Sequence, residues 1–168
     1  EKGLAVAAKK ATRIASEGVV DIMVSEDGKS AAMIEVNAET DFVAGGDEFK
    51  ELALKVARVI AAQAPADVDA LNALVVNGKS VEDMIKEKIA TIGEKITIRR
   101  FVCHEGNLQT YIHNAKIGVL LATDKADEVL SKDVCLHIAS SAPEFVSRKD
   151  IPQSVIEEET RIEMGKED

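Results

Sequence analysis

The sequence predicts an α+β fold with two related subdomains, each a small antiparallel sheet with helices packed on one face, followed by the start of a helical hairpin. Apolar residues recur at helical spacing in several segments and alternate at strand spacing in others. An Asp-Gly pair between two strand-like runs indicates an antiparallel hairpin. Because 46% of the 168 residues are hydrophobic but only 3% are aromatic, we expect a folded core of Ala, Val, Ile and Leu.

The first elements are a helix and a hairpin. Residues 3–15 carry apolar side chains at helical spacing, and Gly18 follows as a stop signal. Residues 19–24 and 31–36 are rich in β-forming side chains and flank the turn at 26–28, so they predict paired strands. The apolar positions of the leading helix are Leu4, Ala8, Ala11 and Ile14.

Residues 37–46 are expected to form a loop that ends at Asp47, the predicted N-cap of the next helix. That helix has a single apolar stripe and ends before Pro65. A short helix is predicted around residues 68–76, followed by a turn at Asn77-Gly78. The stripe consists of Phe49, Leu52, Val56, Val59 and Ile60.

Ser80 and Asp83 resemble a capping box, which predicts a helix that ends at Gly93. Its apolar residues are Val81, Met84, Ile85, Ile89 and Ile92. The remaining predicted elements are strands at 96–103, 108–113 and 116–122, a turn at 105–107, a helix at 126–141 that ends before Pro143, and an acidic helix from Ser154 onward.

Two helical segments, 56–65 and 134–143, resemble each other. Each follows a pair of strands and ends in Ala-Pro, which suggests a repeated strand–strand–helix unit, although chance similarity between amphipathic helices is an alternative. We therefore expect four regions: a leading helix at 1–16, a first core subdomain at 17–106, a second at 107–152, and the start of a coiled-coil hairpin at 153–168.

The net charge of −9 and the cysteines narrow the classes of function. Binding to a phosphate backbone needs clustered positive charge. Because the basic runs are no longer than Lys9-Lys10 and Arg99-Arg100, we expect no direct nucleic-acid binding. No apolar run is long enough for a membrane span. Cys103 and Cys135 lie in predicted element interiors, so we expect buried free thiols and a reducing, cytoplasmic location.

The sequence shows no catalytic motif. His104, His113 and His137 are scattered without ligands at zinc spacing. Gly45-Gly46 lacks the Lys-Ser/Thr of a phosphate-binding loop. We therefore expect no metal, no cofactor and no enzyme activity.

Phe42 lies in a polar segment, where an aromatic side chain needs an explanation. Either it folds back onto the core of its own chain or a partner buries it. The surrounding pattern Asn37-x-x-Thr-Asp-Phe-Val-Ala44 is similar to the signature loop of the elongation factor Ts family. Further segments agree with that family in order and spacing: 7–11 before Glu17-Gly18, 92–100, 111–119 and 137–145.

The resemblance implies a guanine nucleotide exchange factor that binds elongation factor Tu, promotes GDP release and has no active site. It implies that Asp41 and Phe42, at a subdomain tip, disturb the partner's magnesium site, and that His113 presses near the partner's phosphate-binding loop. Ile92 and Gly93 would make an apolar contact with a partner helix. The complete set of expected partner-binding residues is Thr40, Asp41, Phe42, Val43, Ile92, Gly93, His113, Ile117 and Gly118.

The chain departs from the family pattern at Asn114, where the family usually has Gly. Asn tolerates left-handed backbone better than most residues, so the turn can survive. The resemblance also implies a fragment without the family's amino-terminal domain and without the rest of the hairpin. Two other hypotheses remain open: a structural protein that forms a homodimer, and an enzyme with a dispersed carboxylate site.

Overall fold

The computed structural model describes the backbone of residues 2–166 and the side chains of residues 5–166. The first nine elements of the described residues are α1 (Lys2–Lys10), β1 (Glu17–Val24), β2 (Ser30–Ala38), α2 (Asp41–Gly45), α3 (Asp47–Gln63), α4 (Val68–Ala73), β3 (Val75–Val76), β4 (Lys79–Ser80) and α5 (Val81–Ile92). They are followed by β5 (Thr97–Glu105), β6 (Asn107–His113), β7 (Ile117–Thr123), α6 (Glu128–Ser141), a 3-10 turn (Arg148–Asp150) and α7 (Gln153–Met164).

The α+β fold is confirmed, and its first sheet has the antiparallel strand order β1-β2-β5. The Asp-Gly hairpin joins β1 to β2, and Gly28 takes a positive φ of 68° in the turn. The β2–β5 register shifts between Glu35 and Val36, which makes room for an extra residue in β5. Arg99 and Arg100 both reach the Glu35 carboxylate across this bulge, with Nε–Oε distances of 3.8 and 2.7 Å.

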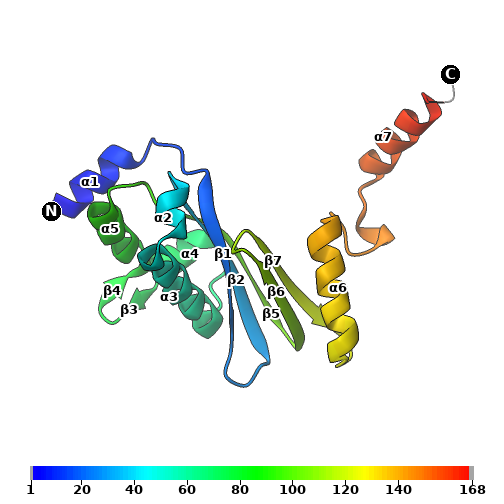
Figure 1. Ribbon diagram of the computed structural model, residues 1–168, viewed down its shortest axis with the longest axis horizontal. Coiled ribbons are helices and arrows are strands. Elements are labelled where there is room, and N and C mark those ends of the chain that lie inside the picture. Colours follow the sequence, from blue (N-terminus) through cyan, green and yellow to red (C-terminus); the bar gives the residue numbers. More distant parts are fainter. Residues whose placement is uncertain (1, 167–168) are drawn as a thin grey trace.

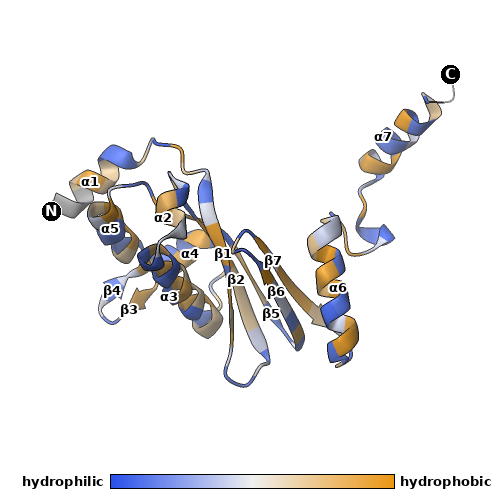
Figure 2. Ribbon diagram, in the orientation of Figure 1, coloured by the Kyte–Doolittle hydropathy of each residue, from blue (hydrophilic) through white to orange (hydrophobic). Residues whose placement is uncertain are grey.

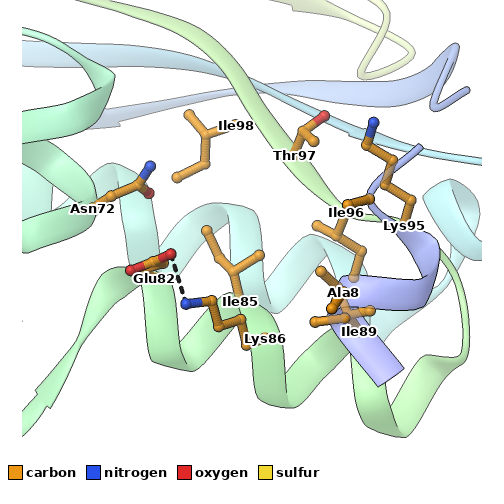
Figure 3. A pocket seen from close by; sticks show the side chains of 12 residues that line it. Ala8, Asn72, Glu82, Ile85, Lys86, Ile89, Lys95, Ile96, Thr97 and Ile98 are labelled. Atoms are coloured by element: carbon orange, nitrogen blue, oxygen red, sulfur yellow. Dashed lines mark ion pairs between the residues drawn. The ribbon is translucent and has the colours of Figure 1, made fainter. Parts of the chain in front are cut away.

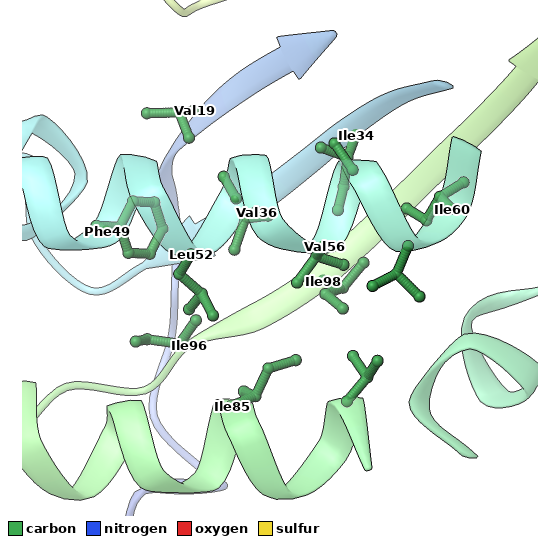
Figure 4. Packing of buried hydrophobic residues seen from close by; sticks show 14 of the residues in the cluster. Val19, Ile34, Val36, Phe49, Leu52, Val56, Ile60, Ile85, Ile96 and Ile98 are labelled. Atoms are coloured by element: carbon green, nitrogen blue, oxygen red, sulfur yellow. The ribbon is translucent and has the colours of Figure 1, made fainter. Parts of the chain in front are cut away.

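The core lies between this sheet and the helices on one of its faces (Figures 1 and 4). The predicted stripe of α3 is buried, and Phe49 and Ile60 are among its largest enclosed side chains. They pack with Ile34 and Val36 of β2, while Ile85 of α5 closes the core from below in Figure 4. Side chains at helical spacing on α3 thus meet alternate side chains of β2.

The two Ala-Pro segments end their helices in the same way. Ala64 and Ala142 have left-handed backbone, with φ of 42° and 45°. Their N–H groups donate to the carbonyls of Ile60 and Ile138, one turn earlier. The sequence similarity between α3 and α6 therefore extends to the geometry of their carboxyl ends.

Several predicted boundaries were wrong. The leading helix ends at Lys10 because short turn bonds follow, and Ile14 is 83% exposed beyond it. The side chain of Leu4 lies outside those that the structure describes. The N-cap of α3 is Gly46, and Asp47 is the first helical residue, where its charge still favours the helix dipole.

The loop predicted at 37–46 contains regular structure, and the helix predicted around 68–76 is shorter than expected, because α4 ends at Ala73 and Val75-Val76 form the strand β3. Residues 37–46 continue β2 to Ala38 and then form the helix α2. The predicted turn at Asn77-Gly78 joins the short strands β3 and β4, and both of its residues have positive φ. Their left-handed backbone matches the turn type that short hairpins favour.

The β6–β7 hairpin lies on the side of the first sheet away from α3, and α6 covers its outer side (Figure 1). The helix α7 points away from these layers in the same view. Within the described residues, every helix is too short or too polar to cross a membrane.

The close approach of the hairpin to the first sheet depends on Gly118 in β7. A Cβ atom at this position would lie 2.4 Å from Val20 Cγ1 and 2.9 Å from Met33 Sδ. Val20 is β-branched and adjusts poorly. We therefore expect Gly118→Ala to lower the free energy of unfolding by about 1–3 kcal/mol through overpacking, measured by urea denaturation.

The control is Gly45→Ala. A Cβ at Gly45 has nothing within 4 Å, and Gly45 has no positive φ. Because Ala favours a helix, this change should leave the stability unchanged or raise it slightly. Equal stability losses in the two variants would contradict the packing role of Gly118.

Candidate functional site

The predicted site segments converge at one end of the first sheet. The end of β2 lies beside the starts of β1 and β5, because Ala38 pairs with Glu17 and Asn37 pairs with Thr97. The segment 40–43 follows β2 directly, and the turn at 92–93 leads into β5.

The β6–β7 turn is attached at the same end. The Val20 N–H donates to the Ala115 carbonyl at 2.8 Å. Lys116 Nζ donates to the Gly18 carbonyl at 2.9 Å and to Glu17 Oε2 at 3.3 Å. The structure therefore brings the turn after His113 to the sheet end that carries the other two segments.

The short helix α2 presents Phe42 to solvent. Thr40 is its N-cap and accepts from the Val43 N–H at 3.4 Å. Val43 packs partly against the core and Ala44 is buried, so one side of the helix is anchored. Asp41 is exposed, and Phe42 is 88% exposed. Phe42 does not fold back onto the core of its own chain.

Two glutamates join α2 to the turn after α5. Glu94 accepts from the N–H groups of Glu39 and Thr40 at 3.1 and 3.0 Å and from the Thr40 hydroxyl at 2.7 Å. Glu39 in turn accepts from the Lys95 N–H at 2.7 Å. We call this set of bonds between Glu39, Thr40, Glu94 and Lys95 the glutamate clasp. Carboxylates make strong hydrogen bonds, so the clasp holds two segments that are far apart in sequence.

The segment around α1 adds two cations to the clasp. Lys10 Nζ donates to the Gly93 carbonyl, and Arg13 Nη1 donates to Glu39 Oε2 at 3.2 Å. The hydrogen bond from the Lys95 N–H contributes most to holding the pKa of Glu39 below its ordinary value. Desolvation opposes it, and the hydrogen bond and charge of Arg13 lower the pKa further. Glu39 is thus stabilised in its charged form.

His113 lies at the end of β6 and is exposed. Its Nδ1 is 3.1 Å from the Tyr111 hydroxyl, and its Nε2 is 3.3 Å from the Asn114 amide nitrogen. The rings of Tyr111 and His113 stack with centroids 6.3 Å apart. Asn114 and Ala115 both have left-handed backbone, with φ of 51° and 54°. The turn therefore forms with Asn114 in the position where the family usually has Gly.

The other predicted residues differ in their exposure. Ile117 is partly open to solvent beside His113, whereas Gly118 packs against the first sheet. Ile92 packs partly against the core, and Gly93 ends α5 with a φ of 85°. The structure thus leaves Gly118 and Ile92 only partly exposed, and it presents Asp41, Phe42, His113 and Ile117 on the surface.

A separate cavity of about 440 Å³ opens between α1, α5 and β5 (Figure 3). Ala8, Ile85, Ile89 and Ile96 form apolar walls, and Glu82 pairs with Lys86 at the rim at 2.6 Å. Across the described part of the chain, the structure contains no cluster of three or more His, Cys, Asp or Glu side chains that could hold a metal ion.

Both cysteines are free, as predicted, but only Cys135 is buried. Cys103 is half-buried, which corrects the prediction of two buried thiols. Burial raises the pKa of each thiol, which disfavours the reactive thiolate.

Sequence reasoning missed the glutamate clasp and Lys10. Glu94 lies within the segment 92–100 on which the resemblance rests, but nothing in its sequence context indicates that it contacts Thr40. Finding these contacts would need a signal that links two positions separated by 54 or 55 residues in the sequence.

An exposed aromatic residue, braced at the end of a small sheet, is typical of a protein-binding module. A family model described as "Elongation factor TS" matches residues 39–168, and the chain therefore belongs to the elongation factor Ts family.

Curated relatives agree with this assignment. The chain is 45% identical over 165 residues to elongation factor Ts of Alkalilimnicola ehrlichii, which covers 96% of this chain and 56% of the relative. It is 46% identical over 162 residues to elongation factor Ts of Thiobacillus denitrificans, and the aligned region covers 95% of this chain and 56% of that relative. The chain thus spans little more than half the length of these relatives.

The lowered pKa of Glu39 predicts a pH-dependent contribution to stability. A carboxyl group with a lowered folded-state pKa stabilises the fold above its ordinary pKa, and this contribution is lost as pH falls through the lowered value. We expect Glu39→Gln to reduce the free energy of unfolding at pH 7 and to have a smaller effect at pH 3, measured by urea denaturation. A difference between the two proteins that stays constant or grows on acidification would show that the carboxylate is not stabilised in this way.

Proposed function

We propose that this chain acts in translation elongation as a guanine nucleotide exchange factor for elongation factor Tu. The observation that carries the proposal is the 88% exposure of Phe42 on a helix that the glutamate clasp attaches to the sheet end. Leaving a large apolar side chain in water is unfavourable, and burial against a partner removes that cost. Membership of the elongation factor Ts family supports the choice of partner.

In the proposed mechanism, Phe42 inserts between side chains near the partner's magnesium site. Mg²⁺ requires nearly ideal octahedral geometry. A small displacement of its ligands therefore loosens both the ion and the phosphates of bound GDP. Asp41, exposed beside Phe42, adds a negative charge close to the same site.

The remaining site residues have contact roles in this proposal. His113 and Ile117 flank the β6–β7 turn and press near the partner's phosphate-binding loop. Ile92 and Gly93 meet a helix of the partner's GTPase domain. Thr40, the N-cap of α2, and Val43 within α2 support Phe42. Gly118 supports the β6–β7 turn by packing against the first sheet.

The exchange cycle follows from thermodynamic coupling. If the factor weakens the binding of nucleotide to its partner, the nucleotide weakens the binding of the factor by the same ratio. GDP therefore leaves when the factor binds, and GTP then displaces the factor. The role requires no chemical step by this chain, so we propose a non-enzymatic factor that acts in the cytoplasm.

We expect Phe42→Ala to slow the factor-stimulated release of a fluorescent GDP analogue from elongation factor Tu by about tenfold or more, as for the loss of a central aromatic contact. The matched control is Val146→Ala, which truncates a fully exposed apolar side chain in the segment after α6. Equal release rates with the wild type and Phe42→Ala would contradict the role of Phe42. A lack of stimulation by the folded wild-type chain would contradict the function itself.

Self-association is a second candidate, favoured by the surface of α6. Val129 and Leu130 are 74% and 59% exposed, and Leu136 is exposed as well. Figure 2 shows apolar residues distributed along this helix, which lies at the outside of the layers. A helix that is apolar on several sides is usually covered.

If a homodimer covers this surface, the sedimentation coefficient should rise with protein concentration, and Leu130→Glu should abolish the rise. Glu placed in an apolar interface loses hydration without gaining a partner. A sedimentation coefficient that stays at the monomer value over a hundredfold range of concentration would exclude the homodimer.

A further inference from the structure

Glu94 has an unusual position, because its carboxylate serves a part of the chain far from its own. It comes from the turn between α5 and β5 but accepts from Glu39 and Thr40, where the chain leaves β2. Residues beyond the end of a strand lose their sheet partners, and their N–H groups need other acceptors. The half-buried Glu94 carboxylate supplies such an acceptor.

The helix α2 depends on this contact because it is only five residues long. A helix of this length is not stable on its own propensity. Its N-cap, Thr40, carries a hydroxyl with one proton and free lone pairs. The proton is donated to Glu94 Oε1 at 2.7 Å, which leaves a lone pair to accept from the Val43 N–H at 3.4 Å. Glu94 therefore orients the hydroxyl that caps the helix of Phe42.

The opposite end of the contact is also constrained. Glu94 follows Gly93, whose left-handed backbone ends α5 and whose carbonyl accepts from Lys10. The Lys95 N–H donates back to Glu39 at 2.7 Å. The contact is thus reciprocal, and it attaches α2 to a turn that is itself fixed.

We propose that Glu94 is a positioning residue that holds the Phe42 helix and the Ile92-Gly93 turn at a fixed separation, so that they meet the partner as one preformed surface. The part of this inference that concerns nucleotide exchange rests on the proposed function. A preformed surface loses less conformational entropy on binding than two mobile segments. Glu94 itself is not expected to touch the partner's nucleotide.

The charge and shape of Glu94 can be tested separately. Gln has almost the same shape, but its amide has one acceptor oxygen and an NH₂ group that can only donate. In Glu94→Gln this NH₂ group must face either the N–H groups of Glu39 and Thr40 or the Thr40 hydroxyl. Glu94→Ala removes the acceptors altogether. Glu87→Gln is the matched control, because Glu87 is an exposed α5 residue that pairs with Lys79 instead.

The first measurement is amide hydrogen exchange of residues 39–45 in the native protein. We expect exchange to be about tenfold faster in Glu94→Gln and faster still in Glu94→Ala, because hydrogen bonds to a charged acceptor are lost. Exchange in α3 should not change, which shows that the variants are folded, and Glu87→Gln should match the wild type. Unchanged exchange at residues 39–45 in both Glu94 variants would overturn the inference.

The second measurement places Glu94→Gln in wild-type and Phe42→Ala backgrounds and follows GDP release from elongation factor Tu. If Glu94 acts through Phe42, the substitution Glu94→Gln should slow GDP release about fivefold in the wild-type background and less than about twofold in the Phe42→Ala background. Equal losses in both backgrounds would show that Glu94 acts apart from Phe42 and would overturn the positioning role.

The two measurements separate this inference from the proposed function. If Phe42→Ala alone leaves GDP release unchanged, the proposed role of Phe42 is wrong. The proposed effect of Glu94 on nucleotide exchange is then wrong as well. Hydrogen exchange still decides whether Glu94 orders the helix, because that measurement needs no partner.

Discussion

The burial of the α3 stripe against the β1-β2-β5 sheet is the contact on which the rest of the structure depends. Phe49, Val56 and Ile60 are enclosed with Ile34 of the central strand, so the helix and the sheet cannot move independently. Interiors of this kind are closely packed and resist compression, so the packed elements behave as one rigid unit. The ends of β1, β2 and β5 are thereby fixed relative to one another. Segments 40–43 and 92–93 of the candidate site adjoin those ends, and hydrogen bonds attach the β6–β7 turn to β1.

A binding site at the end of a sheet must combine exposure with a fixed direction. Apolar packing cannot fix Phe42 while leaving it in water, so α2 is anchored by other means: Val43 and Ala44 pack inward, and Thr40 and Glu39 take part in the glutamate clasp. Hydrogen bonds to carboxylates are directional and strong enough to hold a helix of five residues. The polar clasp thus complements the apolar core.

The two strand–strand–helix units share a plan but differ in how completely they are covered. Their helices end in the same left-handed Ala before Pro. However, α3 has its apolar side chains on one buried stripe, whereas α6 keeps Val129, Leu130 and Leu136 exposed. The first unit therefore provides the rigid frame, and the second provides the β6–β7 turn and an apolar outer surface.

The sequence by itself determined the elements with strong local signals: the stripe of α3, the Asp-Gly hairpin, and the helix between Ser80 and Gly93. It also directed attention to Phe42 through its resemblance to a family. Local patterns did not reveal α2, because it depends on a contact with a distant segment. They also did not reveal that short turn bonds end the leading helix at Lys10. The exposure of Phe42 and its attachment through Glu94 were decided only by the tertiary structure, since hydrogen bonds across more than 50 residues leave no periodic trace in a sequence.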